Sequence, residues 1–348
     1  MLMMRRRLIG AALALSAPHV ARAARRNLTI AAPAGIFQTA YDAAVIDPFR
    51  QQNPGIDVTY YPAGASEQIL SLLRSRRVTP SIDVALMELT VAKIATTQGL
   101  LVPLTAASLP GIELPASAFT EGVAGPAALL DCLAIAYSPL RVTPPPTSWR
   151  VLWNRNLAGQ LVLNPAPDWS GVAFTLVANA LFGGDDYRRS LQSGINSISM
   201  IAPGVATWYP IPDMYNVIIN GSASIGVAWN AEGQMRARAS DGKLAMAIPT
   251  EGSVFQVTTI NMTANAKDTD AARAFIAYAL GPEAQQATAE HLFYAPVNAA
   301  VELDPQTLAR TAASPARRNM MMDVDWLDVA TMRGQIARDW RERIMIRR

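Results

Sequence analysis

The sequence predicts an α/β protein that folds as two lobes, and three observations support this prediction. The chain has 348 residues, which exceeds what one small core requires and is enough for two lobes. Short apolar runs alternate with segments of helical periodicity, a pattern that predicts mainly parallel strands with helices on both faces of a sheet. Three consecutive prolines at residues 144–146 stiffen the chain where the first crossing between the lobes is expected.

The segment up to Gln98 shows the alternation of strands and helices most clearly. In the helix expected from Phe37 to Gln52, the side chains of Tyr41, Val45 and Phe49 fall on one face. An Asn-Pro-Gly triplet follows this helix and is a strong turn signal. The expected strands are residues 27–32, 56–61 and 81–86, and the expected helices are residues 37–52, 65–76 and 90–98.

The same two patterns continue through the rest of the chain. The expected strands are residues 129–137, 159–163, 225–228, 244–248 and 254–262. The expected helices are residues 148–154, a segment that ends at Leu181, and residues 214–219, 269–278 and 284–291. Residues 194–201 are expected to contain a short strand, and Trp208 is expected in a loop. Helical stretches are expected around Trp326 and Trp340.

Residues 1–23 have the three parts of a secretory signal peptide. Three arginines at residues 5–7 form a positive head, and the apolar run at residues 8–17 is too short to span a bilayer. The triplet Ala21-Arg22-Ala23 places small residues at the two positions that a signal peptidase recognises. We therefore expect cleavage before Ala24 and a periplasmic protein.

The charge of the chain is concentrated at its two ends. The formal net charge is +3, but removing residues 1–23, which hold four arginines and no acid, leaves −1. Nine further arginines lie from Arg310 onward, so residues 24–309 carry a formal charge of −5. A nucleic-acid binder needs a concentrated basic surface, which this body lacks. With His291 as the only histidine after the signal and Cys132 as the only cysteine, we expect no metal site and no internal disulfide.

A set of short motifs, each unspecific alone, is specific in its order and spacing. The motifs are Asn53-Pro54-Gly55 before Ile56-Asp57-Val58, Pro80-Ser81-Ile82-Asp83-Val84, Gly226-Val227-Ala228-Trp229-Asn230, Pro249-Thr250-Glu251-Gly252 and Tyr294-Ala295-Pro296-Val297-Asn298. These motifs extend over nearly the whole mature chain. Through them the chain resembles the bacterial extracellular solute-binding proteins of ABC importers. Within that family it is most similar to the branch that includes the spermidine/putrescine binders.

The resemblance implies a two-lobed periplasmic binding protein of type II. Each lobe would be a mainly parallel sheet flanked by helices, and hinge crossings would join the lobes. Residues 24–138 and 249–313 would form lobe 1, residues 139–248 lobe 2, and residues 314–348 a C-terminal helical segment that returns to lobe 2. We expect a monomer whose partners are a small-molecule solute and the transmembrane subunits of a permease. No catalytic residue, cofactor or nucleic acid is expected.

The resemblance also implies which side chains line the cleft between the lobes. Trp229 ends an apolar strand, where ligands of open α/β sheets bind, and matches an aromatic residue that packs on the methylene groups of a polyamine. Gln256 and Thr258 stand where polyamine binders have an aromatic residue and the main cation-binding aspartate. Glu88 and Asp168 are therefore the candidates to hold an ammonium group. The alternatives are a core position for Trp229, a solvated charge for Glu88 and a helix cap for Asp168.

Trp208 completes the residues expected to line the cleft around a cationic solute. A second hypothesis is an anionic solute, such as a phosphonate, a phosphate ester or a ferric complex. Backbone N–H groups at Gly35 and at Ser170-Gly171, where a helix begins, would hold the anion, and ordinary capping is the alternative there. A third hypothesis is an exported serine hydrolase using Ser240 and Lys243, which fit an S-x-x-K pattern without its supporting motifs.

Overall fold

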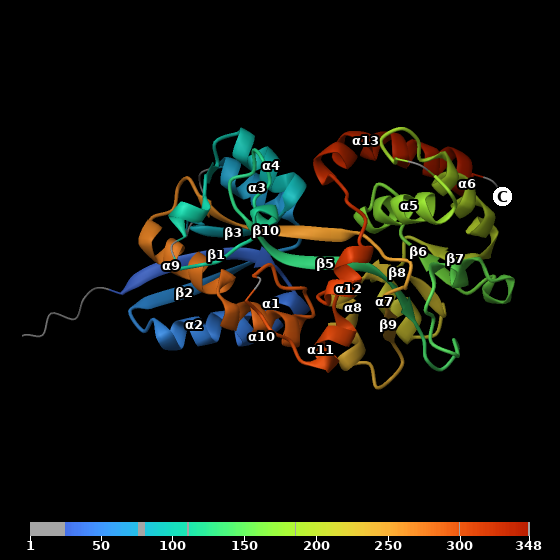
Figure 1. Ribbon diagram of the computed structural model, residues 1–348, viewed down its shortest axis with the longest axis horizontal. Helices are drawn as coiled ribbons and strands as arrows, with labels where there is room; N and C mark the ends of the chain where they lie inside the picture. The colour runs from blue at the N-terminus through green and yellow to red at the C-terminus, as the bar shows by residue number, and fades with distance from the viewer. Residues whose placement is uncertain (1–24, 76–80, 110, 185, 299, 347–348) are drawn as a thin grey trace, which may run out of the picture.

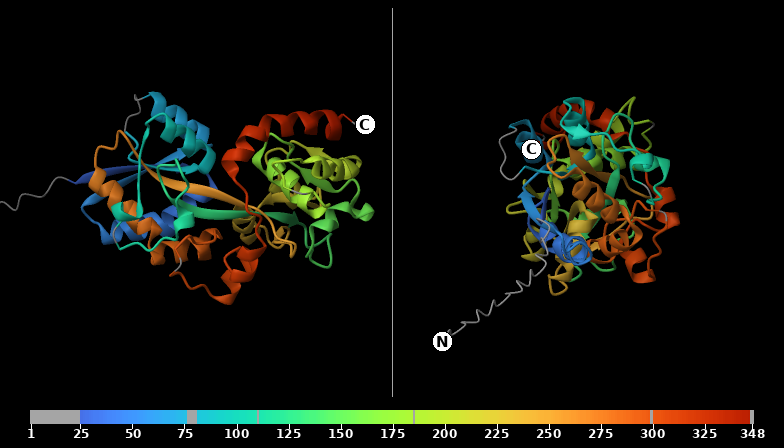
Figure 2. Two further views of the ribbon diagram at one scale, coloured as in Figure 1. Left: turned by 45° about the horizontal axis from the view of Figure 1, so that its top comes forward. Right: turned by 90° about the vertical axis from the view of Figure 1, so that its left-hand side faces the viewer.

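A computed structural model describes residues 25–75, 81–109, 111–184, 186–298 and 300–346 of the chain. The expected signal peptide lies outside these residues. The described chain forms two lobes that lie side by side along the longest axis of the molecule (Figure 1). The left view of Figure 2 shows the same division from a second direction. Within the described residues, no helix has the length and apolar character that crossing a bilayer requires.

Within the described residues, ten strands form one sheet that extends through both lobes. Lobe 1 contains β1 (Arg26–Pro33), β2 (Ile56–Ala63), β3 (Val84–Glu88), β4 (Leu101–Val102) and β10 (Phe255–Thr263). Lobe 2 contains β6 (Leu161–Leu163), β7 (Val205–Trp208), β8 (Ile225–Trp229) and β9 (Ala245–Ala247). Strand β1 pairs parallel with β2 and β3, and β6 pairs parallel with β7 and β8. Each lobe therefore contains parallel strands, as the sequence predicts, while β10 pairs antiparallel with β3 and β4.

Strand β5 (Ala127–Tyr137) belongs to the sheets of both lobes (Figure 1). Its first half, up to Cys132, pairs antiparallel with β10 in lobe 1. From Leu133 onward it pairs antiparallel with β8 and β9 in lobe 2. The pairing thus changes inside the expected strand 129–137. The lobe boundaries expected after residues 138 and 248 stay predictions.

The two faces of the lobe 1 sheet follow from the alternation of side chains along each strand. In β1, Ile30 packs with Phe49 and Phe275 on one face, and Ala31 packs with Ile69 and Leu70 on the other. The helices around the sheet are α1 (Ile36–Tyr41), α2 (Asp47–Gln52), α3 (Ser66–Ser75), α4 (Leu89–Thr97), α9 (Thr269–Leu280) and α10 (Pro282–Leu292). A π-helical turn at Asp42–Ile46 joins α1 to α2. Both faces are therefore covered.

In lobe 2, two sequence predictions are wrong. Trp208, expected in a loop, is the last residue of strand β7. Residues 194–201, expected to contain a strand, belong to helix α6 (Gln192–Ile201). Ile195 and Ile198 are buried one helical turn apart, so their spacing is helical rather than alternating. Gly194 lets α6 pack closely on its neighbour, because a Cβ there would lie 2.4 Å from the carbonyl oxygen of Thr175. The other helices are α5 (Trp169–Leu181), α7 (Met214–Ile219) and α8 (Asn230–Arg238).

The C-terminal segment runs from lobe 1 to lobe 2. Helices α11 (Pro305–Arg310) and α12 (Pro315–Met320) lie near the crossing, and α13 (Trp326–Asp339) lies along lobe 2 (Figure 1). A π-helical turn at Trp340–Met345 follows α13. The indole of Trp340 is fully buried and its Nε1 donates to Oγ1 of Thr175 at 2.8 Å. The segment therefore completes the core of lobe 2.

We expect replacement of Trp340 by alanine to lower the free energy of unfolding by about 3–5 kcal/mol, because it removes a fully buried ring and its hydrogen bond to Thr175. Denaturant titration followed by circular dichroism measures this loss. The matched control is Arg338→Ala on the exposed side of α13, which should change the unfolding free energy by less than about 0.5 kcal/mol. If both variants lost equally little, the C-terminal segment would not belong to the core of lobe 2.

Candidate functional site

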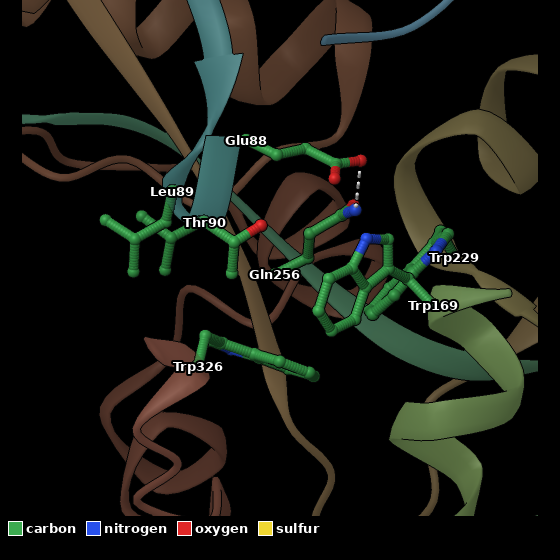
Figure 3. Close-up of a pocket in the computed structure, with 8 residues that line it drawn as sticks. Glu88, Leu89, Thr90, Trp169, Trp229, Gln256 and Trp326 are labelled. Atoms are coloured by element: carbon green, nitrogen blue, oxygen red, sulfur yellow. Dashed lines mark hydrogen bonds between the residues drawn. The ribbon is translucent and has the colours of Figure 1, made fainter. Parts of the chain in front are cut away.

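A cavity of about 600 Å³ lies between the lobes. Lobe 1 lines it with Ala65, Glu67, Glu88, Asp131, Gln256 and Tyr294. Lobe 2 lines it mainly with Asn164, Asp168, Trp169, Ser170, Tyr215 and Trp229, and Arg333 enters from α13. A narrow extension of about 20 Å³, enough for one water-sized group, is lined by Glu88, Thr90, Trp169, Trp229, Gln256 and Trp326 (Figure 3). We call the two cavities together the cleft.

The cleft forms where strands of the two lobes end. Glu88 is the last residue of β3, and Trp229 is the last residue of β8. Asp168 and Ser170 follow β6 and begin α5. Polar and aromatic residues that directly follow buried parallel strands meet at one edge of a sheet, which is where ligands of open α/β sheets bind. The fold therefore gathers residues that are far apart in the sequence.

The cleft is strongly acidic. Its described lining holds six carboxylates, Glu67, Glu88, Asp131, Asp168, Asp213 and Glu232, and one basic residue, Arg333. Arg236 forms ion pairs with Asp213 at 3.3 Å and with Glu232 at 2.8 Å. Among the described residues, no basic group lies within 4.0 Å of the other four carboxylates. Their charge is left for a cation to compensate.

Glu88 is partly buried at the lobe 1 side of the cleft. Its Oε1 accepts a hydrogen bond from Nε2 of Gln256 at 3.1 Å, which Figure 3 shows as a dashed line. The pKa of Glu88 is raised to about 7. Burial is the largest cause, the negative charges of Glu67 and Asp168 act in the same direction, and the positive charge of Arg333 opposes them. The solvated loop charge considered from the sequence therefore does not describe Glu88.

Asp131 is a cleft residue that the sequence analysis missed. It lies on β5 opposite Gln256 of β10 and is only 4% exposed. Its Oδ1 accepts from the backbone N–H of Cys132 at 2.7 Å and of Ala231, in the first turn of α8, at 2.9 Å. Burial raises the pKa of Asp131 to about 7, although these hydrogen bonds oppose the shift. The sequence signal that could have identified Asp131 is that it is the single charged residue inside an otherwise apolar strand.

Three tryptophans form the apolar part of the cleft (Figure 3). Trp229 is partly buried, and its carbonyl accepts from the hydroxyl of Tyr215 at 2.9 Å. Trp169 and Trp326 pack edge to face with ring centroids 5.7 Å apart. The indole of Trp326 is fixed by a 2.5 Å hydrogen bond to the carbonyl of Phe255. Rigid aromatic faces beside carboxylates suit an alkylammonium group, because the rings attract cations and also cover methylene groups.

The eight residues expected from the sequence divide into two groups. Five line the cleft, namely Glu88, Asp168, Ser170, Trp229 and Gln256. The other three do not occur in the described lining, namely Gly35, Trp208 and Thr258. Gly35 is exposed before α1, Thr258 pairs with Glu88 within the sheet, and the ring of Trp208 packs edge to face on Trp340 at 6.0 Å.

Asp168 and Ser170 are hydrogen-bonded to each other at the start of α5. Oδ1 of Asp168 accepts from the backbone N–H of Ser170 at 2.8 Å and from its hydroxyl at 2.6 Å. Asp168 is thus the N-cap of α5, the alternative considered from the sequence, and it lines the cleft as well. Because the Asp168 side chain already accepts the backbone N–H of Ser170, that donor is not free to hold an anionic ligand.

Ser240 and Lys243 lie at the end of α8, away from the described lining of the cleft. The hydroxyl of Ser240 is buried, donates to the carbonyl of Ala237 at 2.9 Å and accepts from the N–H of Leu244 at 3.1 Å. Lys243 is exposed. The hydroxyl therefore closes a turn. Among the described residues, no group of three His, Cys, Asp or Glu side chains has a metal-binding arrangement.

Known proteins are similar to this chain in part of its sequence or in its fold. The spermidine/putrescine-binding periplasmic protein of Escherichia coli K12 is 26% identical over 156 residues, which are 44% of this chain and 43% of that relative. The spermidine/putrescine ABC transporter substrate-binding protein of Streptococcus pneumoniae superposes with a TM-score of 0.74 at 20% identity, covering 93% of this chain and 100% of the other. A ferric binding protein from Campylobacter jejuni superposes with a TM-score of 0.65 at 17% identity, covering 91% and 99%.

These structural matches show that the fold is that of the type II periplasmic binding proteins. The curated relative from Escherichia coli is matched over less than half of its length. The family model described as "Bacterial extracellular solute-binding protein", in contrast, matches residues 44–316, which is most of the chain. The chain therefore belongs to the family of bacterial extracellular solute-binding proteins.

Proposed function

We propose that this protein is the solute-binding component of an ABC importer and that it captures a small cationic, polyamine-like solute in the cleft. The carrying observation is the set of four cleft carboxylates, Glu67, Glu88, Asp131 and Asp168, which lie beside tryptophan rings and have no basic partner within 4.0 Å among the described residues. A buried ammonium group needs carboxylates near it, and its methylene groups need apolar cover. The relatives named for spermidine and putrescine support the same ligand class.

Capture would close the cleft around the solute. Glu88 and Gln256 belong to lobe 1, whereas Trp169 and Trp229 belong to lobe 2, so a solute touching all four is held by both lobes. Contacts made with both lobes stabilise the closed form relative to the open one. The transmembrane subunits of a permease would recognise the closed monomer. The expected signal peptide would place this encounter in the periplasm.

The second candidate is an anionic solute, such as a phosphonate, a phosphate ester or a ferric complex, and a ferric binding protein shares the fold. The acidic lining and the capped N-terminus of α5 oppose it. We expect putrescine and spermidine to raise the unfolding temperature of the purified protein and methylphosphonate to leave it unchanged. Thermal unfolding with each compound, followed by titration calorimetry, measures this. Stabilisation by the phosphonate alone would refute the proposal.

Trp229 provides a sharp test of the cleft itself. We expect Trp229→Ala to weaken spermidine binding by about 10- to 100-fold, because the variant loses a desolvated aromatic face beside the ammonium group. Titration calorimetry measures the dissociation constant. Trp208→Phe is the matched control, since Trp208 is absent from the described lining, and it should change affinity by less than about twofold. Equal losses in both variants would place the binding site elsewhere.

The pKa values of Glu88 and Asp131, both raised to about 7, predict that binding releases protons. A nearby ammonium favours the ionised carboxylates, so affinity for a polyamine should rise as pH rises from about 6 to about 8. Titration calorimetry in buffers of different ionisation enthalpy measures the protons released. Glu88→Gln should reduce the rise, whereas Glu283→Gln, an exposed change on α10, should keep it. Affinity that falls with pH would contradict the prediction.

A further inference from the structure

We propose that the solute carries a carboxylate as well as an amine, and that Arg333 binds the carboxylate. This inference rests on the proposed function and keeps its amine, but it replaces the simple polyamine by an amino acid with a terminal amine. It assigns the amine to the carboxylates of lobe 1 and the carboxylate to lobe 2.

Arg333 is held in place without using its full hydrogen-bonding capacity. Its Nε donates to the carbonyl of Pro167 at 2.8 Å, and its guanidinium carbon lies 4.4 Å from the ring centroid of Trp169. Within the described residues, no carboxylate lies within 4.0 Å of it, and no hydrogen bond from its two Nη atoms is found. The side chain is therefore oriented in advance, with donors left to pair with a ligand oxygen.

Trp169 supplies a second donor beside Arg333. Its Nε1 is buried and has no hydrogen-bond partner among the described residues. A buried donor without an acceptor costs free energy, so such a group in a binding cleft indicates that a ligand or a water provides the acceptor. Because the guanidinium of Arg333 stacks on this same indole, the two donors belong to one region of lobe 2. A diamine offers no acceptor for either donor.

The opposite charge lies across the cleft on lobe 1. Glu67 and Glu88 extend from α3 and β3, and neither has a basic partner within 4.0 Å among the described residues. Arg333 lines the same cavity as Glu67 and Glu88. A solute with an amine and a carboxylate joined by a short chain would pair with the carboxylates of lobe 1 and with Arg333 of lobe 2. One such solute would then bridge them with opposite charges at its two ends.

Arg333 could also act only by lowering the negative potential of the cleft. In that case its removal would affect every amine in the same direction, with or without a carboxylate. Two probes with the same four-carbon chain separate these roles. They are 4-aminobutanoate, which carries one amine and one carboxylate, and 1,4-diaminobutane, which carries two amines.

The test is titration calorimetry of both probes with the wild type, Arg333→Gln and Arg333→Lys. We expect the wild type to bind 4-aminobutanoate at least about 10-fold more tightly than the diamine. Arg333→Gln should weaken 4-aminobutanoate by about 10- to 100-fold and leave the diamine unchanged or tighter, and Arg333→Lys should restore part of the loss. The matched control is Arg338→Gln, an exposed change on α13 outside the described lining of the cleft, which should shift neither probe.

The outcomes separate this inference from the proposed function. If the diamine binds more tightly and Arg333→Gln changes both probes in parallel, the carboxylate site is refuted and the cationic solute stands. Pentanedioate and methylphosphonate serve as probes that carry no amine. If either of them binds and neither amine does, both the carboxylate site and the proposed cationic solute are refuted. Absence of binding by all four compounds at millimolar concentration also counts against both. Retained diamine binding by Arg333→Gln shows that this variant keeps an intact cleft.

Discussion

The backbone hydrogen bonds of β5 tie the two lobes to each other at the base of the cleft. One half of the strand pairs with β10 in lobe 1 and the other half with β8 and β9 in lobe 2. Buried ladder bonds are costly to break, so the strand would persist if the lobes changed their relative angle. Asp131 lies directly before the change of pairing and accepts from the first turn of α8, which follows Trp229. The hinge region and the cleft therefore share one carboxylate.

Sequence periodicity predicted most of the strands because buried parallel strands form clear apolar runs. It was wrong at residues 194–201, where buried isoleucines three positions apart mark a helix that a short window does not separate from a strand. The resemblance to a family found Trp229 and Gln256, since these positions follow from strand order. It did not find Trp326 or Arg333, because these residues reach the cleft only through the packing of the C-terminal segment on lobe 2.

Trp208 illustrates a different limit of sequence reasoning. Trp208 was expected in a loop that lines the cleft, but it is the last residue of β7. The strand lies at the edge of the lobe 2 sheet, however, and Trp340 offers its ring an apolar partner there. Only the strand order decides whether the end of a strand faces the other lobe. Pairing between distant strands is not visible in local periodicity.

Repulsion between the lobes explains why closure would require a solute under the proposed function. Glu67 and Glu88 approach from lobe 1 and Asp168 from lobe 2. Burial raises the pKa of Glu88, and the charges of Glu67 and Asp168 add to this shift. Bringing the lobes together without a cation would desolvate these carboxylates further and strengthen the repulsion between them. An ammonium group between the lobes reverses the sign of this interaction. The same charges that favour capture of a cation would therefore keep the empty protein open, so a permease that recognises the closed form would engage the loaded protein.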